Sequence, residues 1–166
     1  MVRKGYLANQ LGFSETGRYL LENLIIPKLS ALGIDVLEPF NECSKRIILP
    51  KIKDDSYSEL LKAWKNFNTQ VPLFNNALMM EADIMLPILD GGHTVDDGTS
   101  SEIGYYAGIK PQNPIFALRT DFRFADNLAA PINIQIMGYI TMSGGMYTSV
   151  DAWLKAIEAW LKRNPC

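Results

Sequence analysis

Apolar residues along this chain follow two different periods, which predicts an alternation of β-strands and α-helices. Five short runs are apolar, rich in β-branched and aromatic residues, and bounded by turn residues, as buried strands are. We expect strands at residues 4–8, 34–39, 83–89, 114–119 and 132–140.

Between these runs apolar residues recur at helical spacing, so we expect helices there. The first helix should begin at Ser14, a typical N-cap, and end at Gly33, with a kink at Pro27. The other helices are expected at residues 56–70, near 72–82, at 100–109 and at 149–163, with loops at 40–55 and 90–98.

The order of these elements indicates the fold class. Strands that alternate with helices favour a parallel sheet covered by helices. We therefore expect one α/β domain over residues 1–166, with a Rossmann-like or flavodoxin-like open parallel five-stranded sheet and helices on both faces. Ligands of such folds bind beyond the carboxyl ends of the strands, and the loop 90–98 leaves the third strand at such an end.

Composition argues against several classes of function. The 166 residues carry a net charge of −2 and no dense basic run, so we expect no nucleic-acid partner. No apolar run approaches the roughly 20 residues of a membrane span, and the N-terminus lacks a signal sequence. Cys43 and Cys166 make no disulfide framework, which favours a reduced, cytoplasmic protein. No cluster has metal-ligand spacing, so we expect neither a metal nor another cofactor.

The stretch DDGTSSEIGYYAG, residues 96–108, contains the candidate chemistry. Glu102 is expected in the first turn of a helix, where the helix dipole and backbone N–H groups keep a carboxylate ionised. A positioned carboxylate can attack a sugar carbon. The alternative is that Glu102 only complements the dipole and that Asp96 and Asp97 only cap the turn. The three acids and the missing P-loop and dinucleotide motifs argue against a phosphate-binding loop.

This stretch resembles the signature of the nucleoside 2-deoxyribosyltransferases, in which an aspartate, a Gly-Thr pair and a glutamate with an apolar-Gly-Tyr sequence open a helix. Three further segments resemble the same family and follow its order, namely GYLANQLGF (5–13), EADIMLPIL (81–89) and PIN (131–133). The resemblance implies a pentosyltransferase of nucleotide salvage. Such an enzyme moves 2-deoxyribose between purine or pyrimidine bases with retention at the sugar carbon.

The resemblance also implies roles for individual residues. Glu102 matches the nucleophile that forms a covalent deoxyribosyl intermediate, and Tyr6 matches a tyrosine that orients it. Asp96 matches an aspartate that binds a sugar hydroxyl, and a carboxylate there accepts from a 5′-OH and repels a 5′-phosphate. The alternatives are a core-packing role for Tyr6 and a turn-forming role for Asp96.

Four more residues are expected to contact the substrate. Asn133 matches an asparagine that a neighbouring subunit contributes to the 5′ end of the sugar, and Gln135 would share its face on a regular strand. Asn75 falls where some family members place a base-contacting aspartate, and Phe13 is placed to stack on the base. The alternatives are core packing for Phe13 and a polar strand start for Asn133.

The subunit-shared site implies a homo-oligomer built from dimers, such as a hexamer, with 2′-deoxynucleosides and free nucleobases as its partners. Because Asn75 has no carboxylic proton, either Asp90 or water protonates the leaving base, or base recognition differs from that of the family. His93, the only histidine, is expected to be a solvated loop residue. Two other functions stay open. One is an N-glycoside hydrolase of 2′-deoxynucleosides or their 5′-monophosphates on the same fold, and the other is a nucleoside-sensing module without turnover.

Overall fold

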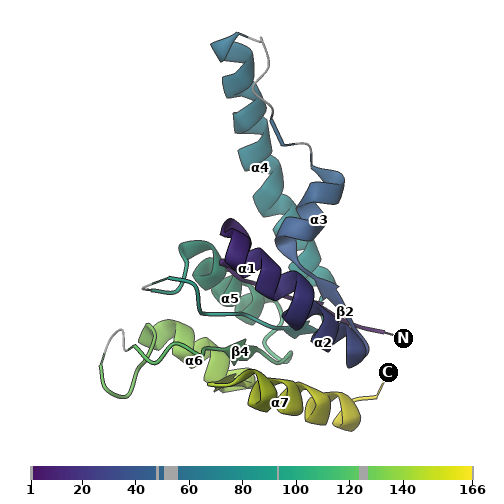
Figure 1. Cartoon of the computed structure of the whole chain (residues 1–166), viewed down its shortest axis with the longest axis vertical. Coiled ribbons are helices and arrows are strands. Elements are labelled where there is room, and N and C mark those ends of the chain that lie inside the picture. The colour runs from purple at the N-terminus through teal and green to yellow at the C-terminus, as the bar shows by residue number, and fades with distance from the viewer. Residues whose placement is uncertain (1, 48, 51–55, 93, 124–126, 166) are drawn as a thin grey trace.

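The computed structural model of the protein describes residues 2–47, 49–50, 56–92, 94–123 and 127–165. It is a mixed α/β fold in which all named strands pair in parallel (Figure 1). One sheet contains β1 (Arg3–Tyr6), β2 (Ile34–Leu37) and β3 (Ile84–Met85) in the order β2-β1-β3. A second sheet pairs β4 (Phe116–Leu118) with β5 (Gly145–Tyr147).

The expected single sheet of five strands is therefore two smaller sheets. They are joined by two isolated parallel bridges, which pair Met85 with Ile115 and Ile88 with Leu118. Pro87 interrupts regular pairing because it has no N–H, although its carbonyl still accepts from Leu118 N at 2.9 Å. The expectation of parallel strands is confirmed, and the strands are shorter than the apolar runs that predicted them.

The fifth strand expected at residues 132–140 is wrong. Helix α6 (Ile134–Ser143) occupies this segment, and the last strand is β5, which follows it. Ile132, Ile136 and Ile140 are four residues apart, so the same apolar pattern that alternates like a strand also fits one face of a helix. The Asn133 side chain decides between the two periods, because it caps α6 by accepting from backbone N–H groups of the first turn.

The first helical region agrees with the expected start and end. Ser14 caps α1 (Glu15–Leu20) by accepting from Gly17 N, and Gly33 follows the last turn with a φ of +83°. A π-helical turn, η2 (Leu21–Ile25), links α1 to α2 (Ile26–Ala31). The irregularity expected at Pro27 thus takes the form of a π-turn just before the proline.

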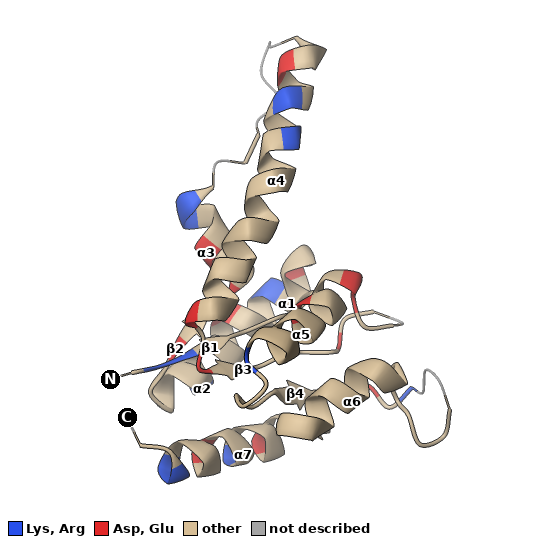
Figure 2. Ribbon diagram, turned by 180° about the vertical axis from the view of Figure 1, so that it is seen from behind, with Lys and Arg blue, Asp and Glu red and all other residues tan. Residues whose placement is uncertain are grey.

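Two expectations between β2 and β3 are wrong, namely a loop over all of 40–55 and a break between two helices. Part of the expected loop 40–55 is helix α3 (Pro39–Arg46), because Glu38 caps it and Pro39 suits its first position. The two helices expected at 56–70 and 72–82 form one helix, α4 (Tyr57–Glu81), with Pro72 inside it. The N-terminal part of α4 projects from the body of the molecule as an arm beside α3 (Figures 1 and 2).

The remaining helices are α5 (Asp97–Ile109) and α7 (Val150–Arg163), both close to their expected ranges. Two clusters of buried side chains cover the two faces of the strands. One includes Tyr6 of β1 with residues of α4, α5 and α6, and the other includes Ile84 of β3 with residues of α2 and α7. Helices therefore cover both faces, as expected. No helix among the described residues is long and apolar enough to cross a membrane.

Trp153 of α7 ties this helix to the second sheet, and its loss should lower stability. The side chain is fully buried, and its Nε1 donates to the Phe116 carbonyl at 2.7 Å. Trp153→Phe removes this bond and part of the buried ring, so we expect a loss of about 1–3 kcal/mol in the free energy of unfolding. Urea denaturation measures it. Trp160→Phe on the same helix, where the ring is only partly buried, is the control and should cost less.

Candidate active site

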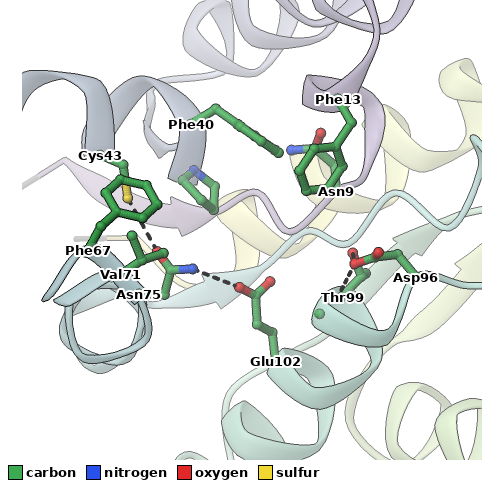
Figure 3. A pocket seen from close by; sticks show the side chains of 12 residues that line it. Asn9, Phe13, Phe40, Cys43, Phe67, Val71, Asn75, Asp96, Thr99 and Glu102 are labelled. Atoms are coloured by element: carbon green, nitrogen blue, oxygen red, sulfur yellow. Dashed lines mark hydrogen bonds between the residues drawn. The ribbon is translucent and has the colours of Figure 1, made fainter. Parts of the chain in front are cut away.

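A pocket of about 280 Å³ opens where β1 and β2 end and α5 begins. This is the edge of a parallel sheet at which ligands are expected. Figure 3 shows the side chains that surround it, which come from the segment after β1, from α3, from α4 and from the start of α5. The residues that line it are Asn9, Phe13, Pro39, Phe40, Cys43, Phe67, Val71, Asn75, Asp96, Gly98, Thr99 and Glu102.

Glu102 points into this pocket with its carboxylate held on one side (Figure 3). Its Oε1 accepts from the Tyr6 hydroxyl at 2.7 Å and from Asn75 Nδ2 at 3.2 Å. Its Oε2 has no hydrogen-bond partner among the described residues. One oxygen is therefore positioned by the protein, and the other is left for a ligand.

The expectation that Glu102 lies in the first helical turn is wrong. Helix α5 begins at Asp97, so Glu102 lies in the second turn, beyond the strongest part of the helix dipole. Burial raises the pKa of Glu102 to about 7, and the nearby charges of Asp96 and Glu38 act in the same direction. The hydrogen bonds from Tyr6 and Asn75 lower this pKa but do not outweigh burial. Glu102 therefore titrates near neutral pH, so that its carboxylate is only partly ionised at pH 7.

Tyr6 combines the two roles that the sequence left open. It is fully buried at the end of β1, and its ring packs in one of the core clusters. Burial and the adjacent Glu102 carboxylate raise the pKa of Tyr6 far above its usual value. The hydroxyl therefore stays protonated and donates to the Glu102 carboxylate.

Asn75 lies on α4 with both ends of its amide engaged. Nδ2 donates to Glu102, and Oδ1 accepts from Cys43 Sγ at 3.8 Å. Burial raises the pKa of the Cys43 thiol, so this sulfur stays protonated as a donor. This weak contact is compatible with the amide orientation that directs Nδ2 toward the carboxylate.

Asp96 caps α5, which was the alternative to a substrate-binding role, and it also lines the pocket. Its Oδ2 accepts from Thr99 N at 2.9 Å, whereas Oδ1 has no partner among the described residues. A Cβ on Gly98 would lie 2.9 Å from Asp96 Oδ2, which explains the glycine of the motif. One carboxylate oxygen thus builds the helix start, and the other is available to a ligand.

Phe13 is not a core residue, because its side chain is 76% exposed at the pocket mouth. Its ring meets the Phe40 ring edge-on, with centroids 4.8 Å apart. Figure 3 shows both rings on the side of the pocket that faces Glu102. Together with Phe67 and Val71 of α4 they make most of the lining apolar.

Asn133 and Gln135 do not join this pocket. Asn133 caps α6 and lines a separate cavity of about 440 Å³, beside Arg119, Ser100 and Asp97. Gln135 lies in the first turn of α6 and supplies a backbone N–H to Asn133. Because the segment is a helix, the shared strand face expected for these two residues does not exist.

Asp90 is also separate from the pocket. Both of its carboxylate oxygens accept from Thr120 N at 2.9 Å, and Asp121 N adds a third contact. The nearby Arg119 is 2% exposed and donates to the Leu89 carbonyl, so it joins the loops after β3 and β4. His93 falls outside the described residues. Among the residues that are described, no group of His, Cys, Asp or Glu is placed to hold a metal ion.

Three buried polar residues near the pocket were missed by the sequence analysis. Thr99 follows Asp96 in the motif, whereas Asn9 and Glu38 lie just beyond the carboxyl ends of β1 and β2. The position of polar residues at strand ends was a usable signal for the latter two. Glu38 also precedes Pro39, which is a typical helix start.

The geometry describes a buried carboxylate facing an aromatic-walled pocket, a site suited to covalent chemistry on a small ring-bearing ligand. A family model for nucleoside 2-deoxyribosyltransferases matches residues 6–148 of the chain. The protein therefore belongs to the nucleoside 2-deoxyribosyltransferase family. Among curated protein sequences, none matches this chain significantly.

Solved structures share the fold at low sequence identity. A conserved protein from Enterococcus faecalis V583 has a TM-score of 0.68 at 22% identity, with 97% of this chain and 100% of that chain covered. A 2-desoxiribosyltransferase from Leishmania mexicana has a TM-score of 0.64 at 16% identity, with 99% of both chains covered. A 2-deoxyribosyltransferase from Bacillus psychrosaccharolyticus has a TM-score of 0.60 at 20% identity, covering 93% of this chain and 90% of that one.

The hydrogen bond from Tyr6 should be visible in the titration of Glu102. We expect the side-chain carboxyl of Glu102 to titrate near pH 7, because burial raises its pKa to about 7. Tyr6→Phe removes a donor that favours the ionised form, so the pKa should rise further, by about one unit. Carbon-13 NMR of labelled glutamate measures this shift. Tyr106→Phe changes another buried tyrosine, which donates to Ala82, and should leave the titration in place.

Proposed function

We propose that this protein is a nucleoside 2-deoxyribosyltransferase that works through a covalent deoxyribosyl–Glu102 intermediate. The observation that carries the proposal is the Glu102 carboxylate, which has one oxygen held by Tyr6 and Asn75 and one without a partner among the described residues. The pocket it faces, about 280 Å³, is near the lower end of the ~300–1,000 Å³ typical of small-molecule sites. Membership of the family supports the same reaction.

In the first step, Glu102 Oε2 attacks C1′ of the nucleoside while the C1′–N bond breaks and its electron pair leaves with the base. In the second step, a ring nitrogen of a new base attacks C1′ and loses its proton to water while the Glu102–C1′ bond breaks, which restores the carboxylate. Two inversions give overall retention. Tyr6 and Asn75 hold the carboxylate on the attacking line and stabilise it again when it leaves.

The proton for the leaving base comes, in this proposal, from water. Asp90, the protein alternative, has its carboxylate occupied by Thr120 and Asp121 and does not line the pocket. Asn75 lines the pocket but has no acidic proton. A base that is easily protonated or that leaves well as an anion should therefore react faster.

The sugar end of the site favours nucleosides over nucleotides. Asp96 presents one carboxylate oxygen without a partner among the described residues, and this oxygen can accept from a sugar hydroxyl. A phosphate at the same position would meet a negative charge. Asn133 lies outside the pocket of its own chain. This supports a cytoplasmic homo-oligomer in which Asn133 of one subunit completes the active site of a neighbouring subunit.

Product analysis tests the reaction directly. Deoxyadenosine mixed with cytosine should yield deoxycytidine and adenine, and Glu102→Ala should abolish the products while deoxyadenosine still binds. Chromatography with and without cytosine measures this. Free deoxyribose and adenine in both mixtures, without deoxycytidine, would identify a hydrolase. If the cytosine mixture stays unchanged, the same assay with deoxyinosine and adenine covers a purine-only enzyme, and no product there would leave a binding module.

Asp96 should govern the choice between a nucleoside and its 5′-monophosphate. We expect kcat/KM for deoxyadenosine to exceed that for its monophosphate by about 100-fold, consistent with about 3 kcal/mol of charge repulsion and a lost hydrogen bond. Asp96→Ser keeps a good helix cap and removes the charge, so this ratio should narrow at least tenfold. The matched control is Asp97→Ser, which removes an acid that lines the other cavity. An unchanged ratio in Asp96→Ser would contradict the assignment.

A further inference from the structure

Asn9 and Glu38 are buried polar residues beside the pocket whose role the proposed reaction does not explain. Asn9 is 6% exposed and Glu38 is 2% exposed. Asn9 Nδ2 donates to Glu38 Oε1 at 3.0 Å, which joins the ends of β1 and β2. A buried carboxylate costs free energy unless its oxygens accept hydrogen bonds. The partners of Asn9 and Glu38 therefore indicate what this buried pair holds in place.

The partners of this pair are the backbones that carry the two aromatic rings. Asn9 Oδ1 accepts from Gly12 N at 3.1 Å, within the 3₁₀ turn η1 (Leu11–Phe13), whose last residue is Phe13. The Glu38 carboxylate accepts from Asn41 N at 2.8 Å in the first turn of α3, and Asn41 directly follows Phe40. Each member of the pair thus anchors the segment of one ring.

The two anchored segments also fit closely against each other. A Cβ on Gly12 would lie 2.2 Å from the Phe40 ring, so the turn and the ring leave no space between them. The Phe13 ring then meets the Phe40 ring edge-on. Phe13 is mostly exposed and therefore gains little positioning from core packing. Its place depends on the short turn that Asn9 holds.

We propose that Asn9 and Glu38 are a positioning pair that fixes the Phe13 and Phe40 rings as the wall on which the nucleobase of the substrate stacks. The inference rests on the proposed function, because it assumes a nucleobase in this pocket. The pair acts through the rings, because its polar atoms are used within the protein. Every polar atom of the Asn9 amide is already engaged within the protein, since Nδ2 also donates to the Leu7 carbonyl at 3.0 Å. Base recognition on this wall is accordingly by stacking and shape.

A double-mutant cycle on binding tests the pair. It is made in the Glu102→Ala background, so that binding is measured without turnover, and calorimetry gives the dissociation constant for deoxyadenosine. Asn9→Ala and Phe13→Ala should each weaken binding at least about fivefold, the lower end of the loss expected for one base–aromatic stack. If Asn9 acts through the ring, the double variant should bind no more than about twofold more weakly than the weaker single variant.

Two further variants separate positioning from general stability. Trp153→Phe removes a buried hydrogen bond far from the pocket, so it should lower the unfolding midpoint and leave the dissociation constant unchanged. Glu38→Gln keeps the side-chain volume but turns one acceptor oxygen into a donor, and should weaken binding several-fold through the same rings. If Asn9→Ala does not fold, the cycle is made with Glu38→Gln and Phe40→Ala, because Glu38 holds the segment of Phe40.

The outcomes distinguish this inference from the proposed function. Fold-losses that multiply in the double variant, or single variants that bind like the background, would overturn the positioning pair even if transfer is observed. A background protein that binds no deoxyadenosine would overturn it as well. If deoxyadenosine binds and the cycle is non-additive, but the unmodified protein shows no turnover, the positioning pair is supported and only the proposed transferase activity is contradicted.

Discussion

The burial of one carboxylate is the constraint on which the site depends. Taking Glu102 out of water raises its pKa from 4.5 to about 7, which corresponds to a free-energy difference on the order of 3 kcal/mol between its protonation states. This pKa is what remains after one hydroxyl and one amide donor have lowered it. A carboxylate that is only partly stabilised as an anion is a better nucleophile than one held by several strong donors.

This constraint explains why distant parts of the chain meet here. Tyr6 comes from the end of β1, Asn75 from the middle of α4, and Glu102 from the second turn of α5. Parallel strands bring these elements to one edge, and the two core clusters hold the helices against the strands. The family model spans these same elements, so the resemblance in the motif reflects a shared architecture and not a short coincidence.

The sequence alone predicted the α/β class, the helices on both faces and five residues that the structure brings together around the pocket. They are Tyr6, Phe13, Asn75, Asp96 and Glu102. It failed where one pattern fits two periods, as at residues 132–140, and where a side chain ends up in a different turn or environment than its spacing implies. The pKa of Glu102 is an example, because burial is a property of the packed fold and no local pattern contains it. Asn9 and Glu38 were missed because their importance lies in a contact between residues 29 positions apart.

Pro72 interrupts the backbone hydrogen bonding of α4 between the arm and the part of the helix that carries Asn75. A proline has no N–H, so the Asn68 carbonyl one turn earlier lacks its usual helical partner. Phe67 and Val71, which line the pocket, lie on the arm side of this missing bond, whereas Asn75, which holds Glu102, lies on the other side. The helix is therefore most compliant between the wall that meets the ligand and the residue that aligns the nucleophile. A bend of α4 at this point would move Phe67 and Val71 relative to Asn75 and would therefore change the width of the pocket.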